Sequence, residues 1–242
     1  MPSISQRNSC QECKISELCL PHGLQQHEIR QLAGIVKNRR PLHLNEFLYV
    51  QGDKCQSLYA VKSGSFRSFM VNTEGDEQTL GFYLPGELMG LDSLQYGSFT
   101  CPLIALETCS VCELPLSSLN ELCSELPGLQ FQIMRVMGKE IASDHDKILS
   151  LGHRSAKCRI AGFLLTLSRR YGDLGFSGTE FNLSMRRHDI ANFLGLTIET
   201  VSRQLADLNK VGVITVKRRG IQINDLDWLK SIVEPGSLAL AE

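Results

Sequence analysis

The sequence predicts an α+β chain in which a β-roll is followed by a long helix and a C-terminal winged helix-turn-helix. Three observations predict it. Short β-rich runs separated by glycine turns fill residues 42–117, a proline-free helical repeat follows Pro127, and two helices joined at a glycine occupy residues 188–209. The 242-residue chain thus divides into a cysteine-rich segment, a β-roll, a long helix and a C-terminal domain, at residues 1–22, 23–117, 118–151 and 152–242.

The β-roll is predicted from runs rich in β-branched and aromatic residues. These runs occupy residues 47–50, 57–61 and 66–71. Turn signals separate them at Gln51-Gly52-Asp53, Lys62-Ser63-Gly64 and Thr73-Glu74-Gly75-Asp76. This spacing favours an all-β roll or sandwich.

The long helix carries a seam whose positions step alternately by four and three residues, as in a coiled coil. The seam holds Gln130, Met134, Met137, Ile141, Asp144, Ile148 and Leu151. We expect the positions from Met134 to Leu151 to pair with a copy of the same helix. A helix packed on its own domain is the alternative. Asp144 stands where the repeat requires an apolar residue, so facing carboxylates would make dimerisation conditional unless Asp144 points outward into solvent.

Composition is that of an ordinary globular protein, with 43% hydrophobic and 21% charged residues. No run approaches the roughly 18 apolar residues of a membrane span. Residues 1–7 lack the apolar core of an export signal. We therefore expect a cytoplasmic protein without membrane association. Nine cysteines in a reducing compartment favour metal ligation or redox sensing over disulfides.

The net charge of −1 conceals an asymmetry. Residues 1–150 hold 12 Lys and Arg against 17 Asp and Glu, whereas residues 151–242 hold 13 against 9. A basic C-terminal half favours a domain that binds a polyanion, and uneven surface charge is the alternative.

The helix-turn-helix is predicted from its turn. A helix over residues 189–194 ends at Gly195, where a positive φ costs little. Thr197 is the expected N-cap of a second helix over residues 198–210. Its expected inward stripe consists of Ile198, Val201, Leu205 and Leu208.

Polar side chains that suit base edges share the opposite face of that second helix. Arg203 can bind guanine bidentately, Glu199 can accept from cytosine, and Ser202 can do either. A hairpin over residues 213–223 carries the basic turn Lys217-Arg218-Arg219-Gly220, a wing suited to phosphates. We expect DNA contacts from Arg187, Thr197, Glu199, Thr200, Ser202, Arg203, Lys217 and Arg218. The alternative is that Glu199 complements the helix dipole and Arg203 is a solvated charge.

Three motifs together resemble the CRP/FNR family of transcription regulators. One is the segment from Asp189 to Arg203 with its Glu-x-x-Ser-Arg pattern, and another is Cys10-x2-Cys13-x5-Cys19-Leu20-Pro21. The third is the run from Leu106 to Pro115, accompanied by Gly75-Asp76-Glu77-Gln78. The resemblance spans about residues 10–225 and is strongest to the oxygen-sensing branch, the fumarate and nitrate reduction regulators (FNR).

The resemblance implies a β-roll like that of cyclic-nucleotide-binding domains, a dimerisation helix and a winged helix. It implies a [4Fe-4S] cluster on Cys10, Cys13, Cys19 and Cys112. It also implies a homodimer that binds double-stranded DNA at TTGAT-N4-ATCAA-like palindromes and activates or represses genes of anaerobic metabolism until oxygen degrades the cluster.

The resemblance further implies an RNA polymerase contact at Gly75, Asp76 and Glu77, for which an ordinary hairpin turn is the alternative. Two positions depart from the family pattern. Arg186 replaces a capping Ser or Thr, and Gln130 replaces an Arg.

The chemistry of the cysteines alone leaves alternatives open. Four thiolates suit a [4Fe-4S] cluster or a structural zinc ion, and thiol redox sensing needs only two. Cys109 competes with Cys112 as the distant ligand, but residues three apart on a strand face opposite ways, and the resemblance selects Cys112. We expect the other cysteines to be small buried apolar residues; they are Cys55, Cys101, Cys109, Cys123 and Cys158.

Two other functions are weighed against this interpretation. A cyclic-nucleotide sensor would share the β-roll and the Pro85-Gly86-Glu87-Leu88 turn, but residues 99–105 offer no arginine for a phosphate. We therefore expect no cyclic nucleotide. A dithiol oxidoreductase using Cys10 and Cys13 would need a strand–helix–strand unit around them, which the sequence does not indicate. We expect no enzyme activity.

Overall fold

The computed structural model describes residues 10–233. Within them, residues 10–69 with 82–139 form one compact unit, and residues 70–81 with 140–233 form a second. The outer ends of the predicted segments 1–22 and 152–242, including the start where we expect no export signal, lie outside the described residues.

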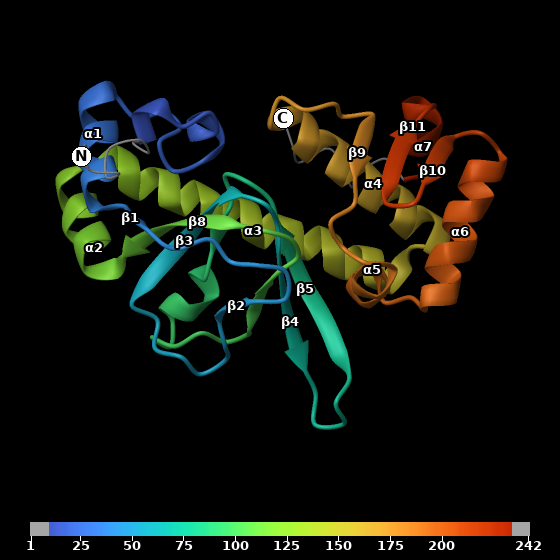
Figure 1. Cartoon of the computed structure of the whole chain (residues 1–242), viewed down its shortest axis with the longest axis horizontal. Helices are drawn as coiled ribbons and strands as arrows, with labels where there is room; N and C mark the ends of the chain where they lie inside the picture. Colours follow the sequence, from blue (N-terminus) through green and yellow to red (C-terminus); the bar gives the residue numbers. More distant parts are fainter. Residues whose placement is uncertain (1–9, 234–242) are drawn as a thin grey trace. The chain divides into compact units, whose positions relative to one another are not determined.

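The β-roll consists of two four-stranded sheets (Figure 1). The first has the order β1-β8-β3-β6, formed by Lys37–Asn38, Ser110–Pro115, Ser57–Ser63 and Leu88–Met89. The second has the order β2-β7-β4-β5, formed by Phe47–Tyr49, Leu103–Ala105, Phe66–Val71 and Glu77–Tyr83. The predicted α+β class with a β-roll is confirmed.

Strand β3 is buried on both faces, which explains its nearly continuous apolar sequence. Tyr59 and Val61 belong to a core formed by residues of both sheets. Leu58 and Ala60 belong to a second core on the other face. That second core also receives helices α1 and α2, which lie side by side (Figure 1). The two helices span Gln26–Ile35 and Leu116–Glu125, and a short η3 turn spans Leu91–Leu94.

The predicted segment 118–151 contains two helices rather than one. Helix α2 ends at Glu125, and α3 spans Pro127–His153. Between them Leu126 has φ −120° and ψ 88°, outside the helical region. The cause is Pro127, because its ring disfavours the helical conformation of the preceding residue while fitting the first turn of a new helix.

The C-terminal unit has helices on a three-stranded sheet of order β10-β11-β9. Its strands are Ile214–Lys217, Gly220–Ile223 and Glu180–Asn182, and its helices α4 to α7 are Ala156–Asp173, Arg187–Leu194, Ile198–Lys210 and Leu226–Ile232. Helix α5 packs on α6, and α7 packs on α4. This is the predicted helix-turn-helix with its wing.

Candidate functional site

The cysteine-rich segment is a chain of tight turns fixed to the β-roll. Two 3₁₀ turns, η1 at Cys10–Glu12 and η2 at Ser16–Leu18, are linked by a backbone hydrogen bond from Ser16 N to Cys13 O of 3.1 Å. Leu20 is 1% exposed and anchors the segment in the second core. The turns place Cys10, Cys13 and Cys19 together although no regular helix holds them.

Gly86 allows this segment to approach the β-roll closely. It has a φ of +91°, and a Cβ there would lie 3.0 Å from Leu18 Cβ. A side chain at this position would therefore be strained and would displace the cysteine-rich segment.

The fourth cysteine that lines the pocket is Cys112 on strand β8, whereas Cys109 stands just before this strand. Cys109 is 1% exposed and lies in the core between the sheets, where its thiol contacts Ser65 O at 3.2 Å. Cys112 packs on the opposite side, against the second core. The expectation that these two residues face opposite ways agrees with this placement.

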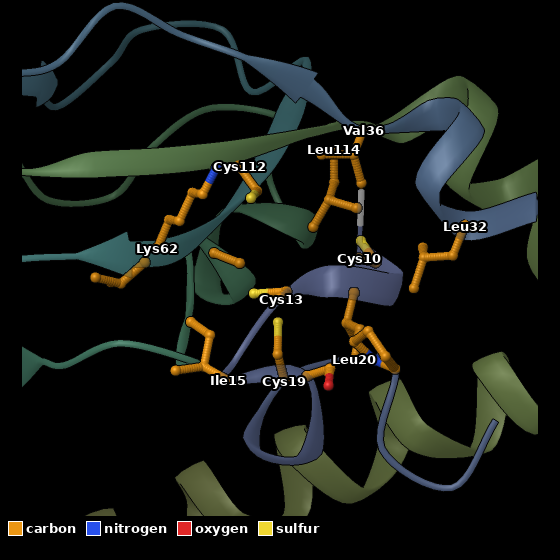
Figure 2. Close-up of a pocket in the computed structure, with 14 residues that line it drawn as sticks. Cys10, Cys13, Ile15, Cys19, Leu20, Leu32, Val36, Lys62, Cys112 and Leu114 are labelled. Carbon is orange, nitrogen blue, oxygen red and sulfur yellow. The ribbon is translucent and has the colours of Figure 1, made fainter. Parts of the chain in front are cut away.

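All four predicted ligands line one pocket (Figure 2). The cysteines are Cys10, Cys13, Cys19 and Cys112, and the remaining lining is largely apolar. In Figure 2 the sulfur atom of Cys19 points toward the Cys13 side chain, with Cys112 on the strand above them. The pocket has a volume of about 30 Å³. Within residues 10–233, no three histidine, cysteine or carboxylate side chains are arranged to hold a single metal ion.

Burial, with smaller contributions from neighbouring thiols, raises the pKa of Cys10, Cys19 and Cys112 and favours their protonated forms. Burial, then the neighbouring Cys112 and Cys13 thiols, raise the pKa of Cys10 to about 11. Burial is also the main reason why the pKa of Cys19 is raised to about 12. Burial raises the pKa of Cys112, and the Lys62 ammonium opposes this rise. Because thiolates are the ligand form, any metal bound here would displace protons.

The remaining cysteines lie elsewhere. Cys55, Cys101 and Cys109 are buried in or beside the core between the sheets, and Cys158 is buried in α4. Cys123 is half-buried in α2.

The turn of the helix-turn-helix has the expected geometry. Gly195 has a φ of +60°, and its N–H donates to Ala191 O. The Thr197 hydroxyl accepts from Thr200 N at 3.2 Å and so caps α6. Arg186 supplies no side-chain cap for α5. Instead Asp189 Oδ2 accepts from Arg186 N at 2.8 Å and performs part of that role.

The predicted base-reading side chains lie together on the outside of α6. Glu199, Ser202 and Arg203 are exposed, while Val201, Leu205 and Leu208 are buried. Ile198 was expected inward but is 42% exposed, because the first turn of α6 projects beyond the packed surface.

The remaining predicted DNA contacts differ in their exposure. Thr200 is half-buried and Thr197 is exposed at the start of α6. Arg187 is half-buried in a hollow beside Ser202, where burial lowers its pKa. The wing turn leaves Lys217 and Arg218 exposed.

Helix α3 presents an exposed apolar stripe on the described chain. Met134, Met137, Ile141 and Ile148 are 59%, 39%, 56% and 66% exposed, and Asp144 is exposed between the last two. Leu151, the last predicted position of the seam, is less exposed. It is half-buried, and a Cβ on Gly195 would lie 3.0 Å from its Cδ2, so it contacts the helix-turn-helix turn.

The predicted polymerase-contact loop is an exposed, ordered turn. The Asn72 side-chain oxygen accepts from Glu74 N and Asp76 N, each at 2.9 Å. Gly75 has a φ of +90°, which the turn requires. Gly75 and Asp76 are exposed, and Glu77 is half-buried at the start of β5.

Two residues in these sites were missed by sequence reasoning. Arg159 donates to Leu151 O at 2.8 Å, Arg154 O at 2.9 Å and Leu194 O at 3.0 Å, so it joins the end of α3 to the helix-turn-helix turn. Lys62 lines the cysteine pocket. Its only signal in the sequence is a charge that ends the apolar run of β3.

Two family models match the two main parts of this architecture. The model of the cyclic nucleotide-binding domain matches residues 39–125, and that of the Crp-like helix-turn-helix domain matches residues 158–232. Among residues 10–233, no helix is both long and apolar enough to cross a membrane.

Similar proteins cover nearly the whole chain. The "Fumarate and nitrate reduction regulatory protein" of Salmonella typhimurium is 43% identical over 92% of this chain and 89% of its own length, and the Escherichia coli K12 protein of that name gives the same values. "Regulatory protein HlyX" of Actinobacillus pleuropneumoniae is 44% identical over 91% of this chain and 92% of its own. The solved structure of FixK2 from Bradyrhizobium japonicum has a TM-score of 0.76 at 28% identity, covering 83% of this chain and 98% of that one. The chain therefore belongs to the CRP/FNR family of transcription regulators, in the branch of the fumarate and nitrate reduction regulatory proteins.

Proposed function

We propose that this regulator responds to oxygen through a [4Fe-4S] cluster held by Cys10, Cys13, Cys19 and Cys112. One observation carries the proposal: thiols from two segments about 90 residues apart line a single, largely apolar pocket. Four thiolates are the usual ligand set of such a cluster. The relatives named for fumarate and nitrate reduction support the same conclusion.

The arrangement favours a cluster over a zinc ion. Zn–S bonds of about 2.3 Å require four sulfur atoms that converge on one point. The described cysteines surround a pocket but form no group that could hold a single ion. The four thiolates could instead hold a [4Fe-4S] cluster without converging on one point.

The cluster would supply an oxygen-labile bridge between the cysteine-rich segment and strand β8. This chain's own residues then carry the response. Cys19 and Leu20 pack in the same core as Leu129, near the start of α3. A movement of the cysteine-rich segment would therefore alter the packing of that helix. The exposed stripe of α3 offers a second copy an apolar surface, and Asp144 keeps the pairing marginal. A marginal equilibrium needs only a few kcal/mol to be switched.

DNA recognition is assigned to α6 and the wing. Arg203, Glu199 and Ser202 would contact base edges of TTGAT-N4-ATCAA-like palindromes, and Lys217 and Arg218 would contact phosphates. Thr197, Thr200 and Arg187 border this surface. A homodimer would present two such helices to the two half-sites.

RNA polymerase is the proposed partner of the loop at Gly75, Asp76 and Glu77. Its support is the exposure and order of the turn, together with the family resemblance. The protein would act in the cytoplasm, where DNA and polymerase are found.

A cyclic nucleotide is not the proposed effector, although the β-roll matches that domain model. Phe99 stacks on Tyr49 with ring centroids 3.6 Å apart, and Leu103 and Ala105 are fully buried. Residues 99–105 therefore serve the core between the sheets and supply no cation for a phosphate.

Paired cysteine substitutions test the ligand assignment. Anaerobically purified Cys112→Ala should lack the brown colour and the iron of the parent and should fail to bind its DNA site. Cys109→Ala changes a residue just before β8 that is buried in the core between the sheets, and it should keep both. A fully loaded Cys112→Ala protein would contradict the proposal.

A further inference from the structure

Lys62 occupies an irregular position in strand β3. Val61 pairs with Val111 and Ser63 pairs with Ser110, so Lys62 is an extra residue opposite β8. A bulge of this kind redirects a side chain at the cost of regular pairing. Here the bulge lies directly beside the strand that carries Cys112.

The redirected side chain reaches the cysteine pocket. Lys62 lines the pocket together with the four cysteines and is half-buried. Figure 2 shows its nitrogen alongside Cys112. Among the lining residues in the described part of the chain, it is the single charged side chain.

We propose that Lys62 is a positioning residue whose ammonium balances the negative charge of a thiolate-bound cluster in this pocket. The proposal rests on the proposed cluster function. Four thiolates outweigh the positive charge of the cluster core, so the whole assembly is anionic, and adding an electron makes it more so. A fixed cation in a largely apolar pocket stabilises such an assembly more strongly than one in water.

The placement of its charge supports this role, since the Lys62 nitrogen lies alongside Cys112 and no other charged side chain lines the pocket in the described residues. Charges and hydrogen bonds around a cluster are general determinants of its reduction potential.

Removing this cation should have two measurable consequences. The reduced cluster loses more stabilisation than the oxidised cluster, so its one-electron reduction potential should fall. We expect the ratio of oxidised to reduced cluster at a fixed potential to rise about tenfold, which is about 59 mV for one electron. The cluster should also be lost faster to an iron chelator, because the thiolates that hold it are less stabilised.

The experiment compares four full-length proteins loaded anaerobically with iron and sulfide: the parent, Lys62→Gln, Lys62→Arg and Lys54→Gln. Spectroelectrochemistry with a soluble mediator gives the midpoint potential, and the electrode supplies the electron. Absorbance decay in a chelator gives the rate of cluster loss. Lys54 is exposed in a loop of the same unit and does not line the pocket, so it controls for net charge.

The proposal expects a lower potential and faster loss for Lys62→Gln, recovery in Lys62→Arg, and parental values for Lys54→Gln. Parental potential and decay in Lys62→Gln, with all four proteins brown, would overturn the role of Lys62 alone. An equal shift in Lys54→Gln would overturn it too, because net charge would then suffice. If no protein acquires iron and sulfide, the proposed cluster function fails and this inference fails with it.

Discussion

Substituting Asp144 with Ala should strengthen dimerisation of the cluster-free protein. Helix α3 is continuous from Pro127 to His153, so Ile141, Asp144 and Ile148 lie on one face. The two isoleucines are more than half exposed, and Asp144 is exposed between them. A second copy of α3 on this stripe would bring two Asp144 carboxylates toward each other.

The magnitude follows from the spacing of packed helices. Axes of packed helices lie about 8–10 Å apart. Two charges about 8 Å apart repel by about 2 kcal/mol at an effective dielectric constant of about 20. Lys147 lies one turn away from Asp144. Burial lowers the pKa of Lys147, and the Asp144 carboxylate partly offsets this by favouring the charged ammonium. Partial neutralisation reduces the repulsion to about 1–2 kcal/mol, or about 5- to 30-fold in the dimerisation constant.

Sedimentation equilibrium in air measures this directly. Asp146→Ala is the matched control, because it removes the same charge from the same helix two positions away from the stripe. The effect of Asp144→Ala should shrink with added salt, since screening acts over about 8 Å at physiological ionic strength. An Asp144→Ala protein that stays monomeric like its parent, or an equal gain in Asp146→Ala, would refute the reasoning.

Further predictions concern the C-terminal unit. Arg203→Ala should lose about 1–3 kcal/mol on the specific DNA site and relax discrimination there, and equal losses on random DNA in a binding titration would assign Arg203 to phosphate. Lys217→Ala should weaken all sequences alike and reduce the salt slope of binding; a loss confined to one sequence would contradict this. Gly195→Ala should lower the stability of the unit by about 1–2 kcal/mol because its φ is +60° and a Cβ would lie only 3.0 Å from Leu151 Cδ2. Gly172→Ala, in α4 with no atom near its Cβ, should instead be neutral or stabilising in thermal unfolding.

The sequence predicts those parts of the fold that depend on local patterns. The strand runs, the Gly195 turn and the Thr197 cap are each encoded within a few residues. The start of α3 at Pro127 was also local, since proline restricts its predecessor and fits the first turn of a helix, but the predicted boundary at residue 118 placed α2 in the same segment. The outward position of Ile198 could not be read from periodicity, because it depends on where the packed surface of α6 ends.

Residues whose roles depend on distant partners were harder to predict. Arg159 caps carbonyls on α3 and beyond α5, separated from it by up to 36 positions, and an arginine in a helix gives no signal of such partners. Leu151 fits the seam of α3 equally well whether it meets another chain or the Gly195 turn. Strand parity is a local rule and predicted that Cys109 and Cys112 face opposite ways, while the choice of Cys112 came from the family resemblance. The direction of the Lys62 side chain could not be predicted, since it results from a bulge in β3.

Iron and acid-labile sulfide, measured per chain in anaerobically purified protein before and after exposure to air, test the central claim most directly. The account predicts about four of each before air, as a [4Fe-4S] cluster requires, and a marked loss of both afterwards. Protein that contains zinc, or no metal, under anaerobic conditions would contradict it. So would a full complement of iron and sulfide that survives air unchanged.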